Sequence, residues 1–403
     1  KSMRRGDRRV KTICLFSPGI LPIPAVKGGA IETLLELLIE HNEIEKKVRF
    51  LVVSVHDEEA EARSQKYKQT DFIYIKRNLL FAGAYKAVKV LMRKLFKIRF
   101  SRPNLYYWLG VRKVLAAKPD AVVAEGGDYA TFRQFTQALG KENVFLHLHH
   151  HLRGDAELDS VFGEVLTVSR FVKDEWLATS SMDSGQVTVL PNAIDNNRFA
   201  DSLSSEEKTA LRKDLGLSPT DFVVLFCGRV IPEKGVKELI LALEKVADPT
   251  VKLLIMGSPN FALKDKSDYL EEVEALVKKN AERMVFTGYV ANAATYRYYA
   301  IADVVSVPTL IEEAAGLVVL EAMAVGRPLI VTNSGGIPEY ATPELAMILE
   351  RNYDLVNKLA DSITTLKENE TLRSQMAKNA KERSLRYTKE VFYTDFVDRF
   401  KDR

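Results

Sequence analysis

The chain has 403 residues, of which 46% are hydrophobic and 28% charged, with a formal net charge of +4; this length exceeds a single hydrophobic core and predicts two or three globular domains. Its two cysteines, Cys14 and Cys227, exclude a disulfide framework and favour a reducing compartment. No apolar run approaches the ~18 residues of a membrane-spanning helix, and the first residues lack the apolar stretch of a signal peptide, so the expected location is the cytoplasm.

Short apolar, β-branched runs alternate with helix-length amphipathic segments along the chain. Seven runs in the first half predict strands at residues 10–16, 48–55, 71–75, 121–125, 144–148, 164–168 and 187–190. Six runs in the second half predict strands at residues 222–227, 251–256, 284–288, 303–308, 328–332 and 345–349. Helical patterns lie between them, as at residues 30–42, 236–246 and 268–283. Two series of wholly apolar strands separated by helices predict two doubly wound, Rossmann-like α/β domains with parallel sheets.

A polar stretch at residues 191–208, rich in Asn, Asp and Ser, indicates the domain boundary. We expect an N-terminal domain at residues 1–195 and a C-terminal domain at residues 200–380. The aromatic-rich helix predicted at residues 384–400 lies in a C-terminal segment, residues 381–403, that is expected to cross back onto the N-terminal domain. Because open parallel sheets bind ligands at the carboxyl ends of their strands, residues directly after strands are the candidates for a site.

Basic residues follow the strand predicted at residues 222–227, in the segment GRVIPEKGVKELI. Gly228 lets the chain turn, and Arg229 and Lys234 then precede a helix. Two cations beside the free N–H groups of a helix N-terminus suit a diphosphate. Two solvated basic residues in an ordinary loop are the alternative.

The segment IEEAAGLVVLEAMAVG, residues 311–326, places Glu321 inside an apolar run, where a carboxylate is costly unless it is paired. Glu313 lies eight positions earlier, ahead of the same run. Carboxylates accept hydrogen bonds from sugar hydroxyls well, often two at once. A glutamate favoured by the helix dipole is the alternative, and it suits Glu313 better than Glu321.

A helix is expected to begin within this segment near Ala315 or Gly316, after the strand that ends at Pro308. The backbone N–H groups of Gly316, Leu317 and Val318 would then be free to hold an anion.

Gly28 and Gly29 precede the first predicted helix in the segment VKGGAIETLLELL. Glycines there allow a close approach of the backbone to a ligand. A plain turn is the alternative, since the segment contains neither G-x-G-x-x-G nor a Walker pattern.

Four of the six histidines lie in the segment VFLHLHHHLRGD; they are His147, His149, His150 and His151. In a strand His147, His149 and His151 would share one face, but no cysteine or suitably spaced helix completes a ligand set. We predict no metal site here, and no Asp-x-Asp pair is present to bridge a metal and a diphosphate. One histidine beyond the strand is expected to reach the ligand as a polar or acid–base group.

In their order along the chain, these segments resemble the retaining glycosyltransferases of the two-Rossmann-domain (GT-B) type, in particular family four. The matching segments are GGAIE, HLHHH, LTVSRFVKDE, VLPNAID, GRVIPEKG, FTGYV and EEAAGLVVLEAMAVGRPLIVTNSGGIPEY. Glu313 and Glu321, with seven residues between them, form that family's hallmark. The resemblance covers nearly the whole chain and is strongest over residues 186–342. It implies two domains that face each other across a cleft, the first binding the acceptor and the second a nucleotide-sugar.

The resemblance also implies a role for each matched residue. Arg229 and Lys234 would neutralise the diphosphate of the donor. Glu313 would hold hydroxyls of the transferred sugar, and Glu321 would bind the ribose. His149 would lie near the reacting sugar. Further donor contacts would come from Gly28, Gly29, Asn192, Gly288, Val290, Gly316, Leu317 and Val318. Family members transfer without a metal ion, and no cofactor is expected.

Two positions differ from the usual family pattern. Ala314 stands where glycine commonly follows the first glutamate, and alanine disfavours positive φ. His150 and His151 stand where Asp or Asn commonly follows the histidine.

Positive charge is concentrated in residues 72–119, which contain twelve Lys and Arg and no Asp or Glu. Within this segment, residues 84–99 show a helical pattern with an apolar face and a basic face. The pattern is typical of a helix in an anionic membrane interface; a helix docked on its own sheet is the alternative. We expect no nucleic-acid partner, because no binding motif accompanies the charge.

Together these features predict a retaining, metal-independent hexosyltransferase. Its donor would be a nucleotide-diphosphate sugar, with a UDP-sugar favoured. Its acceptor would be a glycan or polyprenyl-linked sugar in surface polysaccharide or glycoconjugate synthesis, used in the cytoplasm at the inner face of the membrane. The alternatives are a non-catalytic nucleotide-sugar-binding subunit of a transferase and a sugar-nucleotide epimerase on the same scaffold.

Overall fold

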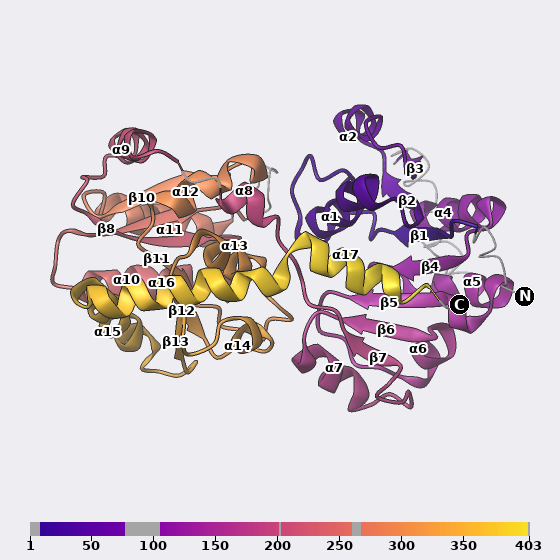
Figure 1. The fold of residues 1–403 in the computed structure, drawn as a ribbon. Helices are drawn as coiled ribbons and strands as arrows, with labels where there is room; N and C mark the ends of the chain where they lie inside the picture. Colours follow the sequence, from indigo (N-terminus) through magenta and orange to yellow (C-terminus); the bar gives the residue numbers. More distant parts are fainter. Residues whose placement is uncertain (1–8, 77–104, 201–202, 260–266, 402–403) are drawn as a thin grey trace, which may run out of the picture. The chain divides into compact units, whose positions relative to one another are not determined.

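The computed structural model describes residues 9–76, 105–200, 203–259 and 267–401. The predicted basic helix at residues 84–99 lies outside these residues. The chain divides into two compact units (Figure 1). Unit 1 consists of Lys1–Thr167, Lys173–Leu190 and Tyr393–Arg403, and unit 2 consists of Val168–Val172 and Pro191–Phe392.

Unit 1 is built on a seven-stranded parallel sheet with the order β3-β2-β1-β4-β5-β6-β7. Its strands are β1 (Thr12–Phe16), β2 (Arg49–Val55), β3 (Thr70–Ile75), β4 (Ala121–Ala124), β5 (Val144–Leu148), β6 (Glu164–Thr167) and β7 (Val187–Val189). The connecting helices are α1 (Ala30–Glu45), α2 (Glu58–Ser64), α4 (Leu105–Ala117), α5 (Arg133–Leu139), α6 (Ala156–Val161) and α7 (Arg170–Leu177). The central strands are apolar on both faces because helices cover both sides of the sheet.

Unit 2 is built on a six-stranded parallel sheet with the order β10-β9-β8-β11-β12-β13. Its strands are β8 (Phe222–Cys227), β9 (Val251–Met256), β10 (Met284–Gly288), β11 (Val304–Val307), β12 (Leu329–Thr332) and β13 (Ala346–Leu349). Its helices are α8 (Asn196–Ala200), α9 (Ser205–Asp214), α10 (Val236–Lys245), α11 (Asp268–Lys279), α12 (Thr295–Ile301), α13 (Leu317–Val325), α14 (Ile337–Tyr340), α15 (Leu355–Glu368) and α16 (Glu370–Ser384). Two hydrophobic clusters, one on each face of this sheet, form its core.

Each predicted strand is present, and every strand pair in the described residues is parallel. The predicted fold of two doubly wound α/β domains is therefore confirmed. In each sheet the strand order reverses beside the first strand, between β1 and β4 in unit 1 and between β8 and β11 in unit 2. These reversals are the points at which doubly wound sheets bind ligands.

The C-terminal segment differs from the single helix predicted at residues 384–400. Helix α16 ends at Ser384, a 3-10 turn covers Leu385–Tyr387, and α17 covers Lys389–Asp398. The last turns of α17 belong to unit 1, where the Tyr393 hydroxyl donates a hydrogen bond to Asn42 Oδ1 at 2.6 Å. Aromatic side chains such as Phe396 then pack into the core of unit 1.

Within the described ranges, no helix combines the length and the apolar character that crossing a bilayer requires.

Candidate functional site

The strand-order reversal of unit 2 carries most of the predicted site residues. Strand β8 ends at Cys227, and Arg229 and Lys234 follow it. Strand β11, its neighbour in the sheet, ends at Val307, and Glu313 follows it. Because adjacent parallel strands end at the same edge, the fold brings these two loops together although about 80 residues separate them.

Lys234 and Glu313 form an ion pair, with Nζ of Lys234 donating to Oε1 of Glu313. The side chains are 24% and 17% exposed, so the pair is only partly shielded from water. Thr309 Oγ1 lies 3.0 Å from the same carboxylate oxygen, which makes it a second hydrogen-bond partner for Glu313. The ion pair therefore joins two residues to which the family resemblance gives different roles, Lys234 with the diphosphate of the donor and Glu313 with its sugar.

Gly235 explains how the two loops approach so closely. Its φ is +70°, and a Cβ atom added there would lie 2.0 Å from the carbonyl oxygen of Pro308. Any other residue would push the β8 loop away from the β11 loop. The glycine that directly follows Lys234 thus keeps this lysine beside Glu313.

Arg229 lies on the surface of the same edge and is exposed. Within the part of the chain that the structure describes, its guanidinium forms no ion pair or hydrogen bond. A guanidinium that is always charged and makes no structural contact is available for an anionic ligand.

The N-terminus of α13 lies beyond the same loop. Gly316 is the N-cap residue, and no side chain caps the helix. Among the described residues, no acceptor bonds to the N–H groups of Gly316, Leu317 and Val318, which are partly exposed. The helix start predicted near Ala315 or Gly316 is confirmed, and its free N–H groups form a site that favours negative charge.

Glu321 lies in the second turn of α13 and has a partner that the sequence did not reveal. The hydroxyl of Tyr299 in α12 donates to Glu321 Oε2 at 2.6 Å. Burial raises the pKa of Glu321, while the Tyr299 hydrogen bond and the positive charge of Arg198 oppose that rise. The second oxygen, Oε1, forms no hydrogen bond to any described residue. One oxygen is thus fixed and the other is left for a ligand.

Asn192 and the Gly288–Val290 turn complete the predicted residues in unit 2. Oδ1 of Asn192 is buried and meets no donor among the described residues. Gly288 ends β10 with φ +69°, and a Cβ added there would meet no atom within 4 Å. Val290 packs partly against the core. Within the described residues, no hydrogen bond or ion pair joins these residues to Lys234 or Glu313.

Gly28 and Gly29 lie in unit 1, directly before α1. Both have positive φ, +77° and +99°. A Cβ on Gly29 would lie 2.2 Å from Oε2 of Glu32 in the first turn of α1. Glu32 is 5% exposed, and burial raises the pKa of its carboxyl to about 7. Gly29 therefore allows a buried acid to lie against the backbone of this loop.

The raised pKa of Glu32 predicts a pH-dependent effect of Glu32→Gln on the stability of unit 1. Below the ordinary value of 4.5 the carboxyl is protonated in both the folded and the unfolded chain. Between about pH 4.5 and 7 the unfolded chain ionises while the folded chain stays protonated, so the wild type loses stability that the uncharged variant keeps, and the loss is complete above about pH 7. We expect the free energy of unfolding of the variant, relative to the wild type, to increase by about 2.5 kcal/mol between pH 5 and pH 8.

Tryptophan fluorescence during denaturant unfolding measures this difference in unit 1 alone, because Trp108 and Trp176 both belong to that unit. Glu58→Gln, at the exposed start of α2, is the matched control and should show no such pH-dependent difference. Parallel pH trends for Glu32→Gln and the wild type would contradict the raised pKa.

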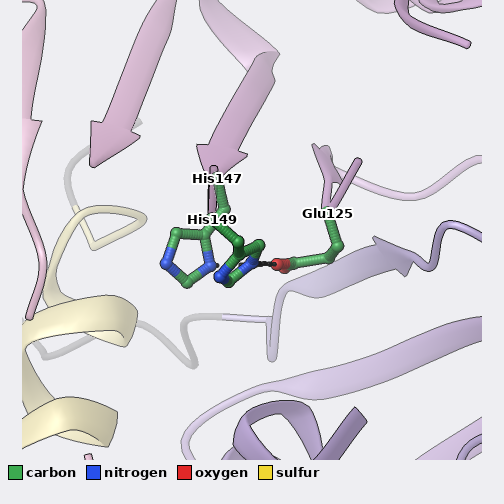
Figure 2. A group of neighbouring side chains, drawn as sticks. All are labelled: Glu125, His147 and His149. Atoms are coloured by element: carbon green, nitrogen blue, oxygen red, sulfur yellow. Dashed lines mark hydrogen bonds and ion pairs between the residues drawn. The ribbon is translucent and has the colours of Figure 1, made fainter. Parts of the chain in front are cut away.

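The histidine segment contacts Glu125, which the sequence did not single out as a site residue. Strand β5 ends at Leu148, so His149 to His151 do not continue a strand face. Oε2 of Glu125, which directly follows β4, lies 2.9 Å from Nδ1 of His147 and 2.8 Å from Nε2 of His149 (Figure 2). One possible ligand atom from each of these three residues lies within 4.8 Å of the other two, which is a set that could hold a metal ion. The position of Glu125 at the carboxyl end of a predicted strand was the available signal.

Comparison with known proteins adds independent information. Residues 207–383 match the family model described as glycosyl transferases group 1. The uncharacterized glycosyltransferase MJ1607 of Methanocaldococcus jannaschii is 34% identical over 183 residues, which is 45% of each chain. The lipopolysaccharide 1,2-N-acetylglucosaminetransferase of Salmonella typhimurium is 23% identical over 334 residues, 82% of each chain. The first of these matches thus spans less than half of its relative, and the second spans most of it.

Solved structures match over nearly the whole chain. The Anabaena protein Alr3699/HepE in complex with UDP has a TM-score of 0.75 at 18% identity, covering 97% of this chain and 99% of that one. WaaG, described as a glycosyltransferase involved in lipopolysaccharide biosynthesis, has a TM-score of 0.67 at 16% identity, covering 97% and 100%. At identities this low, the structural similarity shows the fold alone. The match to the group 1 glycosyl transferase family model lies within unit 2.

Proposed function

We propose that this chain is a retaining, metal-independent glycosyltransferase that uses a nucleotide-diphosphate sugar. The observation that carries the proposal is the edge of unit 2, where Arg229, Lys234 and the open N-terminus of α13 place positive charge beside Glu313. Such an arrangement suits a ligand with a diphosphate next to a polyhydroxylated ring, which is the chemistry of a sugar nucleotide.

Each group at this edge has a distinct role in the proposal. Arg229, Lys234 and the N–H groups of α13 stabilise the diphosphate as it leaves with developing negative charge. Glu313 accepts hydrogen bonds from hydroxyls of the transferred sugar, and Glu321 accepts them from the ribose through its unpaired oxygen. Gly288, Val290 and Asn192 border the nucleoside.

The reaction proposed is attack by an acceptor hydroxyl on the face from which the diphosphate departs. The anomeric carbon develops oxocarbenium character, and a phosphate oxygen of the leaving group helps to take the proton of the acceptor. Positive charge at the edge of unit 2 lowers the barrier because it is strongest where the leaving oxygen becomes negative. In unit 1, Gly28, Gly29 and His149 contact the donor in this proposal.

The donor we favour is a UDP-sugar. The Anabaena structures that share the fold are complexes with UDP and with UDP-glucose. Thermal-shift measurements with UDP, GDP and ADP test this choice, because a nucleotide that binds the folded chain raises its melting temperature by mass action. A rise in melting temperature with GDP or ADP but not with UDP would show that the donor carries guanine or adenine and not uracil.

The acceptor we propose is a glycan or a polyprenyl-linked sugar at the inner face of the membrane. The Salmonella relative is named as a lipopolysaccharide glycosyltransferase, and the sequence of residues 84–99 has a basic and an apolar face suited to anionic lipid. Flotation with anionic vesicles should show binding that weakens with salt. If the chain does not bind anionic vesicles at low salt, the proposed location at the membrane is wrong.

Transfer by the purified chain tests the proposed function directly. Incubation with UDP-sugars and a lipid-linked acceptor should release UDP and form a product with the anomeric configuration of the donor. The reaction should persist with a chelator present. Donor binding without transfer would indicate a non-catalytic subunit, and isomerised free sugar would indicate an epimerase.

The proposed ribose contact predicts the effect of Tyr299→Phe. Loss of the 2.6 Å hydrogen bond leaves Glu321 without its fixed partner, so the carboxylate is less well placed for the ribose. We expect KM for the sugar nucleotide to rise about tenfold and kcat to change less than about twofold, since the contact is equal in the ground and transition states.

Steady-state kinetics measures this effect. Tyr298→Phe is the control, because within the described residues the hydroxyl of Tyr298 forms no hydrogen bond. An unchanged KM in Tyr299→Phe would contradict the proposed contact between Glu321 and the ribose.

A further inference from the structure

Glu125 holds two imidazoles with one carboxylate oxygen in the interior of unit 1. The side chains of Glu125 and His147 are fully buried, and that of His149 is 8% exposed. Figure 2 shows the carboxylate of Glu125 pointing at both rings. Its Oε2 lies 2.9 Å from Nδ1 of His147 and 2.8 Å from Nε2 of His149. Burying a carboxylate costs free energy, so we expect its contacts with the two imidazoles to contribute to stability or to function.

The protons of this cluster follow from the chemistry of its members. Burial alone would raise the pKa of Glu125, but the charge of His147 and the hydrogen bonds of His147 and His149 hold it below its ordinary value. An ionised carboxylate only accepts hydrogen bonds. Both short contacts must therefore be donated by the rings, through Nδ1–H of His147 and Nε2–H of His149.

His149 is consequently limited to one protonation form at neutral pH. Burial, together with the neighbouring His147, lowers the pKa of His149 to about 4. A neutral imidazole carries a single proton, and in His149 that proton is on Nε2. Nδ1 then carries a lone pair, and it bonds to no residue that the structure describes.

We propose that Glu125 is a positioning residue that fixes His149 as its Nε2–H tautomer, so that Nδ1 accepts a hydrogen bond from a hydroxyl of the transferred sugar. This inference rests on the proposed function. It deepens that function by giving His149 a defined chemical role as a neutral acceptor. The histidine is then not a cationic acid, which narrows the acid–base role predicted from the sequence.

A metal ion held by the same three residues would require the opposite tautomers. A metal binds the lone pair of an imidazole nitrogen, so Nδ1 of His147 and Nε2 of His149 would both be unprotonated. The contacts of 2.8 and 2.9 Å are ordinary hydrogen-bond lengths and are explained by protons at those two positions. The location of the ring protons therefore decides between the two arrangements.

Long-range ¹H–¹⁵N NMR of the full chain with ¹⁵N-labelled histidine locates these protons. The chain has six histidines, and single His→Gln variants assign the signals of His147 and His149. We expect the proton of His149 on Nε2 and a proton on Nδ1 of His147, with a spectrum that a strong chelator leaves unchanged. The reverse pattern, or a change on chelation, overturns the proposal in favour of a metal site.

Glu125→Met tests whether the carboxylate sets the tautomer. Methionine has a similar unbranched length but is only a weak acceptor, so the wild-type preference should give way to a mixture of both tautomers. We expect kcat/KM to fall by about 10- to 100-fold while the circular dichroism spectrum is kept. A single unchanged tautomer, or wild-type kcat/KM in the folded variant, overturns the proposal.

Two further variants keep the test decisive if Glu125→Met does not fold. Glu125→Gln retains an acceptor oxygen without the charge and should lie between the wild type and Glu125→Met in both tautomer preference and kcat/KM; wild-type values would overturn the proposal.

Glu61→Met is the matched control, because Glu61 contacts His56 Nε2 at 3.1 Å on the surface of unit 1. It should leave the tautomer of His149 and kcat/KM unchanged, and a loss equal to that of Glu125→Met would overturn the assignment.

The two readouts separate this inference from the proposed function. The tautomer of His149 is measured in the free protein and does not depend on any substrate. If the wild type shows the expected tautomer but transfers no sugar, the proposed function fails. If the wild type transfers sugar but shows the opposite tautomer, only the role given to Glu125 fails.

Discussion

Replacing Lys234 with alanine is expected to lower kcat by about 10²- to 10³-fold, the loss typical when one preorganised charge is removed from a developing anion. The same variant should bind UDP more weakly, because the diphosphate loses a cation. The structure places this lysine at the strand-order reversal of unit 2, in a partly exposed pair with Glu313. Transfer kinetics and UDP titration measure the two effects separately.

Lys237→Ala is the matched control for this prediction. Lys237 lies one turn later, at the start of α10, where it pairs with Glu272 on the surface. Its removal should change neither kcat nor UDP affinity. Near-wild-type transfer by folded Lys234→Ala would show that the leaving diphosphate does not depend on this lysine.

The sequence predicted the fold well because local patterns determine it. Each predicted strand is a run of four to eight mostly apolar, often β-branched residues, and helices separate nearly all of these runs. In an open parallel sheet covered on both faces, such runs are buried wherever they pair. The run at residues 222–227, for example, becomes β8 with five of its six residues buried. Helix α13 likewise begins beside Gly316, where the sequence places a residue that favours helix ends.

Partners that come from distant elements could not be predicted in this way. Glu321 looked unpaired because its sequence neighbours are apolar, yet Tyr299 reaches it from α12. Glu125 meets His147 only because β4 and β5 lie side by side in the sheet. A single sequence records neither contact, since each depends on how strands and helices pack and not on spacing along one element.

Local irregularities were the other source of error. The helix predicted at residues 384–400 assumed one continuous period, but the 3-10 turn at Leu385–Tyr387 interrupts it before Thr388 and α17. The alternation of faces considered for His147 to His151 applies only inside a strand, and β5 ends at Leu148. In both cases a change of backbone conformation resets the direction of the side chains that follow.

Replacing Glu313 with glutamine is expected to affect transfer and nucleotide binding in different ways. The neutral amide holds the hydroxyls of the transferred sugar less strongly as positive charge develops on the ring, so kcat should fall by about 10²- to 10³-fold. In the free protein Glu313 also competes for Lys234, with which it pairs. Removing that charge frees the lysine for the diphosphate, so the affinity for UDP should stay equal or increase.

Glu312→Gln is the control for this variant, because Glu312 is the adjacent residue but is 43% exposed and pairs with Arg351. It should retain transfer close to that of the wild type. Calorimetric titration with UDP and transfer kinetics then distinguish two functions of the ion pair. If Glu313→Gln binds UDP as weakly as Lys234→Ala does, Glu313 acts only by holding Lys234 in place, and the contact with the transferred sugar is disproved.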